Sequence, residues 1–215
     1  MVNDKKVKPT VFGVGVNDSK EPVKDCPYYR VWTSMLSRCY SSKVQERYPT
    51  YKGCTVEEGW KTLSVFKEWM KTQQWEGRYL DKDLLVKGNK VYSAETCLFV
   101  DSVVNTFIPN NELNSNGFPT GVTWRKKDQR FVAQISNPIR KSIEDLGSYE
   151  LPSEAYDQWL YRKGQIAKEL AGMQTDPRIA KALLERFPPS NRLLELRAIA
   201  LFTRAGNNLL HTNAK

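Results

Sequence analysis

The chain is poor in the side chains that bind zinc. It has one histidine, His211, and its four cysteines are 13, 15 and 43 residues apart with no Cys-x-x-Cys pair. A zinc site needs several such side chains at close spacing, and a secreted disulfide framework also has characteristic spacings. We therefore expect no zinc and no disulfides, but reduced and mostly buried thiols at Cys26, Cys39, Cys54 and Cys97.

Long apolar runs are missing as well. No segment has the length and hydrophobicity of a membrane span. The first ten residues, MVNDKKVKPT, are charged, and no apolar run of signal-peptide length follows them. We expect a cytoplasmic protein with no membrane partner.

Common catalytic patterns are also absent. We find no internal repeat, no glycine-rich phosphate loop and no Ser/His/Asp set, and we interpret His211, near the chain end, as a surface residue. The 215 residues are 40% hydrophobic and 27% charged, with a formal net charge of +9. This composition is typical of a globular protein with a polyanionic partner, although a basic surface alone is also common in proteins without one.

Residues 121–172 are predicted to form three short strands and a helix. Turn residues at 127–129 and 137–138 separate the strands, and Pro152-Ser153 indicates a helix start with Ser153 as its cap. Ala155, Trp159, Ile166 and Leu170 then share one helical face. In the middle strand, Phe131, Ala133 and Ile135 alternate with Val132, Gln134 and Ser136, which gives one apolar and one uncovered face.

The uncovered side of this sheet is predicted to be basic. Residues 121–142 contain six Lys or Arg and one acid, Asp128. The DNA major groove admits a thin β-ribbon, so we predict double-stranded DNA as the partner. Trp124 is open to two interpretations, as core under the helix, which we favour, or as an outward residue. The predicted DNA-binding residues are Arg125, Lys126, Lys127, Arg130, Gln134, Ser136, Arg140 and Lys141, with Gln134 and Ser136 at base edges.

Several residues in this segment resemble the AP2 domain of plant ethylene-response factors, which also occurs in phage homing endonucleases. They are Gly121-Val122-x-Trp124, Arg130-Phe131-Val132-Ala133-x-Ile135, Leu146-Gly147 and Glu154-Ala155. The resemblance covers about fifty residues and implies DNA binding. Arg125 matches a base-contacting position of the family. Gln134 and Ser136 stand where the plant domains carry Glu and Arg, so the target sequence does not carry over.

Residues 27–109 are predicted to form a second module. Helical periodicity runs from Pro27 to Tyr40 and again through residues 63–70. A strand then carries Asp81 and Asp83 on one face, about 6.6 Å apart at two strand rises. Residues 87–90 read as a hairpin turn that leads into a strand at 91–92.

This second module resembles phage HNH homing endonucleases. The resemblance rests on Trp32-x-x-Met35-x-x-Arg38-Cys39, Tyr51-x-Gly53, Trp60, Phe66 and the stretch 79–107. It implies a hairpin and a helix that hold one divalent metal. Asp81 matches the metal-binding aspartate, Lys82 occupies the position of the histidine base, Asn89 lies near the hairpin asparagine, and Asn105 stands for the final ligand.

Lys82 puts cleavage in doubt. A lysine is a poor base near neutral pH unless its pKa falls by several units, and flanking aspartates act in the opposite direction. Two interpretations of Asp81-Lys82-Asp83 stay open. It is either a strand edge with local ion pairs, or a site where Asp81 and Asp83 bind Mg²⁺ or Mn²⁺ without a protein base.

We therefore expect an α+β fold in consecutive parts. These are an N-terminal arm (1–26), a degenerate HNH-like ββα-metal module (27–109), an Asn-rich linker (110–119), an AP2-like domain (120–172) and a helical tail (173–215). The tail is expected to pack on itself or to form a homodimer.

The function predicted from the sequence is a phage-type double-stranded-DNA-binding protein in the host cytoplasm. Its HNH-type strand cleavage is expected to be weakened or lost. The alternative is a non-catalytic interaction protein that binds a host protein or structured RNA.

Overall fold

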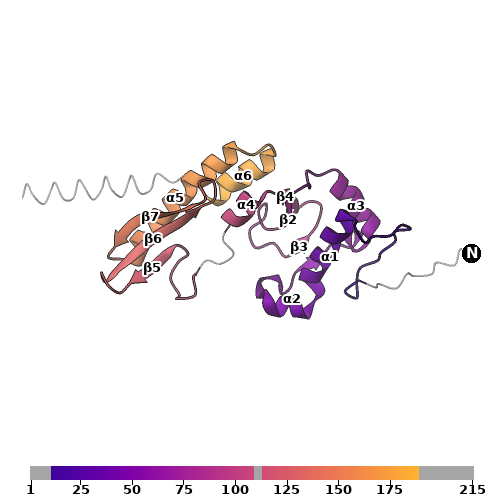
Figure 1. Cartoon of the computed structure of the whole chain (residues 1–215), viewed down its shortest axis with the longest axis horizontal. Helices are drawn as coiled ribbons and strands as arrows, with labels where there is room; N and C mark the ends of the chain where they lie inside the picture. Colours follow the sequence, from indigo (N-terminus) through magenta and orange to yellow (C-terminus); the bar gives the residue numbers. More distant parts are fainter. Residues whose placement is uncertain (1–10, 109–112, 189–215) are drawn as a thin grey trace, which may run out of the picture. The chain divides into compact units, whose positions relative to one another are not determined.

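The computed structural model describes residues 11–108 and 113–188, which form a mixed α+β protein (Figure 1). The chain divides into two compact units, Met1–Asn105 and Thr106–Lys215. No helix among the described residues has the length and apolar character needed to cross a bilayer.

The first unit is mainly helical, with short strands in its second half. Both predicted helices are present, and α1 ends at the predicted residue. The elements are α1 (Pro27–Tyr40), α2 (Ser42–Arg47), the 3₁₀-helix η1 (Pro49–Tyr51), β1 (Thr55–Val56), the 3₁₀-helix η2 (Gly59–Lys61), α3 (Leu63–Lys71), β2 (Tyr79–Asp81), β3 (Val91–Tyr92) and β4 (Leu98–Val100). Helix α4 (Ser102–Phe107) follows β4 and crosses the division between the units.

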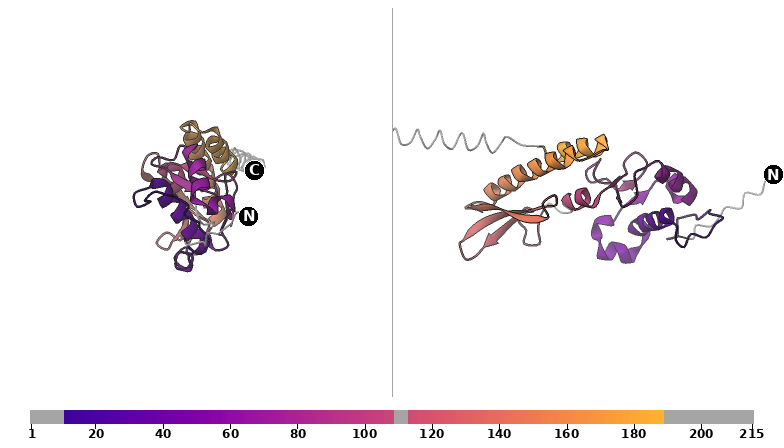
Figure 2. Two further views of the ribbon diagram at one scale, coloured as in Figure 1. Left: turned by 90° about the vertical axis from the view of Figure 1, so that its right-hand side faces the viewer. Right: turned by 45° about the horizontal axis from the view of Figure 1, so that its top comes forward.

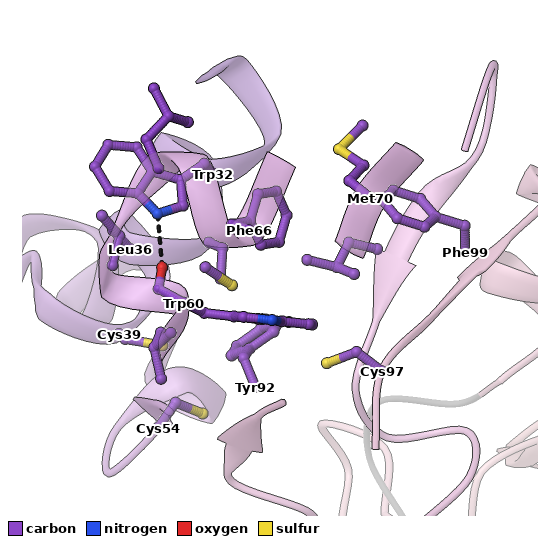
Figure 3. Packing of buried hydrophobic residues seen from close by; sticks show 14 residues of the cluster. Trp32, Leu36, Cys39, Cys54, Trp60, Phe66, Met70, Tyr92, Cys97 and Phe99 are labelled. Carbon is purple, nitrogen blue, oxygen red and sulfur yellow. Dashed lines mark hydrogen bonds between the residues drawn. The ribbon is translucent and has the colours of Figure 1, made fainter. Parts of the chain in front are cut away.

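Aromatic side chains from α1, η2 and α3 form the core of the first unit (Figure 3). The indole Nε1 of Trp32 donates a hydrogen bond of 2.7 Å to the carbonyl oxygen of Trp60, and both side chains are buried. A buried indole N–H needs an acceptor, so this bond fixes α1 against η2. The ring of Trp60 packs edge-on against Phe66.

The strands of the first unit pair differently from the prediction. Strand β3 pairs in parallel with β1, with Thr55 opposite Val91, while β2 pairs antiparallel with β4, with Asp81 opposite Leu98. The predicted hairpin between β2 and β3 is therefore wrong. The turn at Gly88 exists, with φ of +76°, but it leads the chain to β1 instead of back to β2.

The second unit contains the predicted three-stranded antiparallel sheet. Its strands β5 (Val122–Arg125), β6 (Arg130–Asn137) and β7 (Ser142–Tyr149) lie in the order β5-β6-β7. Two helices follow, α5 (Pro152–Gly172) and α6 (Pro177–Arg186). Leu146 is the extra residue of a β-bulge, because Ala133 pairs with Gly147 and Gln134 with Asp145.

Helix α5 covers one face of the sheet (Figure 2). The four residues predicted to share its apolar face, Ala155, Trp159, Ile166 and Leu170, are all buried. The predicted cap is wrong: Leu151 precedes the first helical residue, Pro152, and the carboxylate of Glu154 accepts the N–H of Leu151. Ser153 therefore lies inside the first turn.

Gly121 sets the close approach of β5 to α5. Its φ is +85°, and a Cβ atom there would lie 2.0 Å from Cδ1 of Trp159. Only glycine combines this backbone conformation with so little space.

The described part of the predicted linker packs against the sheet of the second unit. The amide Nδ2 of Asn114 donates to the carbonyl of Val122 at 2.7 Å, and the ring of Phe118 lies 5.3 Å from that of Phe131. The unit begins at Thr106, so residues 113–119 belong with the sheet. In the predicted tail, α6 starts as expected, with the Asp176 carboxylate accepting the N–H of Arg178. The expected last helix and His211 lie outside the described residues.

Candidate nucleic-acid interface

The face of the sheet opposite α5 carries four of the eight predicted contact residues, and the other four lie in the loops at the two ends of β6. Because side chains alternate along a strand, Arg130, Gln134 and Ser136 of β6 share this face, and all three are exposed. Pairing places Asp145 opposite Gln134 and Ile143 opposite Ser136. Polar groups in the middle of the sheet are thus accessible to a partner.

Val132 also lies on this face but is only 3% exposed. Arg125 crosses this part of the face, because its Nη2 reaches from β5 across β6 and donates to Oγ of Ser148 at 2.8 Å. Ser148 lies directly opposite Val132 on β7. The stem of Arg125 therefore shields the valine, a common use of long basic side chains. The carboxylate of Asp128 holds the same guanidinium through Nε at 2.6 Å.

The three predicted arginine contacts all have acidic partners. Arg125 pairs with Asp128, Arg130 with Glu150 at 3.2 Å and Arg140 with Glu144 at 3.7 Å. The pairs of Arg125 and Arg130 are exposed and of low intrinsic strength, so a phosphate can replace their carboxylates at small cost, whereas Glu144 is partly buried. Each arginine is therefore held in place by a carboxylate, and its charge is already paired in the free protein.

The three predicted lysine contacts are different. Lys126, Lys127 and Lys141 are exposed, and none makes an ion pair or side-chain hydrogen bond within the described residues. The first two lie in the β5–β6 loop and the third in the β6–β7 loop, at opposite ends of β6. Seven strand rises separate these ends by about 24 Å. Positively charged lysines without an ion-pair partner therefore lie at both ends of the polar face.

Strand β7 reduces the excess of positive charge. Residues 121–150 contain six basic and four acidic side chains, and Asp145 and Glu150 are exposed. The basic character predicted from residues 121–142 is correct for that segment, but the whole sheet is more balanced. Contact with a polyanion is thus best supported at the loops and not at β7.

A buried polar network fixes the β6–β7 loop, and sequence reasoning missed it. Asn137 is fully buried, and its Oδ1 accepts the N–H groups of Ile139 and Arg140 at 3.0 and 3.1 Å. Its Nδ2 donates to Glu144 at 2.7 Å. The Asn-Pro turn signal marked the position but not its partners.

Glu144 links this loop to α5. The guanidinium of Arg162 donates through Nε and Nη2 to the two carboxylate oxygens, at 2.5 and 3.0 Å. Hydrogen bonds from Arg162 lower the pKa of Glu144 to about 2. Such two-pronged pairs fix geometry as well as charge, so the loop that carries Arg140 and Lys141 has a defined place relative to the helix.

Trp124 is neither a core residue nor part of the uncovered face. It lies two residues from buried Val122, on the α5 side of the sheet, yet it is 41% exposed. Its ring packs 4.7 Å from that of Phe131. The interpretation of Trp124 as core is therefore wrong.

In the first unit, Lys82 is buried in a structural role. The side chain is 4% exposed, and Nζ donates to both carboxylate oxygens of Asp83 and to the carbonyl of Asn89, all at 2.7 Å. Its ammonium lies 5.8 Å from the ring of Tyr92. All three donors of the ammonium are therefore directed at protein acceptors, which is a structural role.

Asp81 ends strand β2 instead of sharing a strand face with Asp83. Its Oδ1 accepts the N–H groups of Asp83 at 2.9 Å and of Leu84 at 2.6 Å, which turns the chain after Asp81. Asp83 lies outside the strand, so the predicted common strand face of Asp81 and Asp83 is wrong. Burial raises the pKa of Asp81, and the two backbone bonds oppose this rise.

Asn89 closes the loop that follows β2. Its Nδ2 donates to the carbonyls of Lys82 and Val91, and its Oδ1 accepts the N–H of Val91. Asn105 lies on an exposed position of α4, and its N–H donates to the carbonyl of Asp101 within the helix.

The carboxylates of this loop fit a divalent metal poorly. Asp83 is bound to the ammonium of Lys82, and one oxygen of Asp81 is bound to backbone N–H groups. No group of three or more His, Cys, Asp or Glu that could hold a metal occurs in the part of the chain that the structure describes. Mg²⁺ needs several oxygen ligands in near-octahedral geometry, and Asp81 offers one free oxygen.

Comparison with known proteins gave no relatives. No family model, no curated protein and no solved structure matches the chain. Function is therefore inferred from the residues of this chain.

Proposed function

We propose that the protein is a phage-type double-stranded-DNA-binding protein that contacts DNA with the uncovered face of β5–β7. The observation that carries this proposal is the placement of exposed Lys126, Lys127 and Lys141 at the two ends of β6, with exposed Gln134 and Ser136 between them. Lysines suit phosphate contacts, and a glutamine amide suits base edges.

The sequence resemblances support the same proposal. The AP2-like residues fall on or beside β5, β6, β7 and the start of α5, and the HNH-like residues up to Asn105 fall in the first unit. In this proposal the β2–loop–β4–α4 segment is a retained ββα element. Its metal-dependent cleavage has been lost, because Lys82 and Asp83 bind each other.

A selection from random duplexes tests the binding proposal. We expect enrichment of a short sequence, and we expect the affinity to fall steeply with salt because each neutralised phosphate releases condensed cations. Gln134→Ala should change the selected sequence, whereas Lys127→Ala should weaken binding to all duplexes and lower the salt slope by about 1. Equal, sequence-blind losses for both variants would contradict the assigned roles.

Cleavage is tested separately with supercoiled plasmid and Mg²⁺ or Mn²⁺. We expect binding without nicking. Nicking that Asp81→Ala abolishes would show that Asp81 still holds a catalytic metal, and the proposal of lost cleavage would then be wrong.

A protein partner is the second candidate. Ile143 is 73% exposed on the uncovered face, Trp124 is 41% exposed beside the sheet, and Asp145 adds negative charge. Exposed apolar side chains of this kind are typical of protein interfaces. If the selection enriches no DNA sequence, and if the affinity for duplex DNA barely depends on salt, a host protein or structured RNA is favoured over duplex DNA.

A further inference from the structure

A second basic surface lies in the first unit and contains none of the predicted DNA-binding residues. It consists of Lys43 and Arg47 of α2, Tyr48 and Lys52 on either side of η1, and Lys90 before β3; we name it the α2–η1 surface. All five side chains are exposed. Tyr48 is 47% exposed, which is high for a large aromatic residue.

Long-range contacts bring these residues together. The N–H of Thr55 donates to the carbonyl of Lys90 at 2.8 Å, and Nζ of Lys90 donates to the carbonyl of Thr50 at 2.7 Å. Tyr48 and Tyr51 are in ring contact at 6.4 Å. The guanidinium of Arg47 lies over the ring of Tyr48 at 5.3 Å. The surface is therefore continuous from α2 to the start of β3.

The α2–η1 surface is almost entirely positive. Residues 42–55 and 84–93 contain five basic side chains and one acid, Glu46, whereas the whole first unit, residues 1–105, has 17 basic and 13 acidic side chains. Lys43, Arg47, Lys52 and Lys90 form no ion pair within the described residues. The arginines of the sheet face, in contrast, each have a carboxylate partner.

The placement of Lys43 and Arg47 carries a cost in the free protein. They are four residues apart on α2 and so share one face of a short helix, where like charges repel. An anion that bridges both side chains removes this repulsion. The backbone of a nucleic acid supplies such anions as a row of phosphates at regular spacing. A tyrosine hydroxyl can donate a further hydrogen bond to a phosphate oxygen.

We propose that the α2–η1 surface is a second, sequence-independent contact surface for the phosphate backbone of duplex DNA. It rests on the proposed function for the identity of the polymer, but it involves other residues in the other unit. The sheet face would supply sequence preference, and the α2–η1 surface would supply affinity that depends on salt but not on sequence.

The test uses the full chain and a matched pair of triple variants. One variant combines Lys43→Gln, Arg47→Gln and Lys52→Gln; Lys90 is left intact because it bonds to Thr50. The control combines Lys20→Gln, Lys24→Gln and Arg30→Gln, which removes the same formal charge from exposed positions. Lys20 and Lys24 precede α1, and Arg30 lies in its first turn, about 15 Å along the helix from Tyr40, after which α2 begins.

The measurement is fluorescence anisotropy on a mixed-sequence duplex between about 50 and 200 mM salt. We expect the α2–η1 variant to bind at least about tenfold more weakly and its salt slope to fall by about 2 to 3, whereas the control should lose less than about threefold. Circular dichroism checks that both variants are folded. Equal losses in the two variants would overturn the inference.

A third variant separates this inference from the proposed function. Lys126→Gln, Lys127→Gln and Lys141→Gln are combined, alone and together with the α2–η1 changes. If only the sheet variant weakens binding, the inference fails and the proposed function stands. If only the α2–η1 variant does, the inference stands and the sheet is not the DNA-binding face. Tighter binding of an RNA duplex than of DNA through the α2–η1 surface would overturn the choice of DNA.

Discussion

Each of the two units buries a lysine, and the two are held by different means. Lys82 in the first unit is 4% exposed and has a carboxylate, Asp83, and the carbonyl of Asn89 as acceptors. Lys163 in the second unit is 5% exposed, donates to the carbonyl of Phe107 and has no carboxylate partner within the described residues. The carboxylate of Asp83 neutralises the charge of Lys82, whereas the hydrogen-bond acceptor of Lys163 is an uncharged carbonyl.

Aromatic rings take the place of the missing carboxylate at Lys163. Its Nζ lies 3.5 Å from the ring centroid of Phe107, 5.1 Å from that of Phe187 and 5.3 Å from that of Trp159. Ring faces attract a cation, but they do not replace the water that burial removes. Burial, with a smaller effect from Arg186, lowers the pKa of Lys163 to about 7. A buried ammonium without a counter-ion is therefore sensitive to pH near neutrality.

The largest change in stability should come from replacing Lys82, the buried lysine that has a carboxylate partner. Lys82→Met removes a buried ammonium that donates to the carbonyl of Asn89 and to the carboxylate of Asp83, so we expect a loss of about 3 kcal/mol in the free energy of unfolding. Urea unfolding measures the total loss, and hydrogen exchange should locate it in the first unit. A loss below about 1 kcal/mol would show that the loop does not depend on this ion pair.

The next effect is the pH dependence that Lys163 imposes. Its pKa is about 7 in the folded protein and near the ordinary 10.5 in the unfolded chain, so between these values the unfolded chain binds more protons. Stability should therefore rise as pH increases from about 7 towards 10, by about 2 kcal/mol or more.

Lys163→Met is the control for that pH dependence. Methionine fills similar volume without a charge, so the rise above pH 7 should disappear, while stability at pH 7 should change by about 1 kcal/mol or less. Thermal unfolding at several pH values measures both. An unchanged rise in the variant would mean that another group causes it.

The smallest effect should come from Glu144, the paired acid of the second unit. Its pKa is lowered from 4.5 to about 2, so its contribution is present above pH 4.5 and is lost as pH falls towards 2. Glu144→Gln should cost about 1 kcal/mol at pH 7, and the difference from the wild type should vanish near pH 2. A difference that persists in acid would assign the loss to packing instead of charge.

Local patterns predicted the second unit better than the first. Its strands are consecutive in the chain, and turn residues at 127–129 and 137–138 separate them, so alternation and turn chemistry were enough to place β5, β6 and β7. In the first unit, β3 pairs with β1, 36 residues earlier, and no local signal encodes that choice. The turn at Gly88 was recognised, but its partner strand was not.

The surroundings of individual site residues were the least predictable. The pattern Asp81-Lys82-Asp83 left two interpretations open, a strand edge with local ion pairs or a metal site. The ion pair between Lys82 and Asp83 is present, but the burial of Lys82 was not predicted. Lys163 lies within the predicted helix, but its burial was not predicted. Its ring contacts come from Phe107 and Phe187, which are 56 residues before and 24 residues after it.

The position of Arg125 across Val132 couples two kinds of recognition. If its guanidinium leaves Ser148 and Asp128 for a phosphate, the methyl groups of Val132 are uncovered in the middle of a polar surface. Thymine is the one DNA base that presents a methyl group in the major groove. A bound duplex would therefore gain from a thymine facing Val132 only after the arginine has moved, so charge neutralisation would precede discrimination at that base pair.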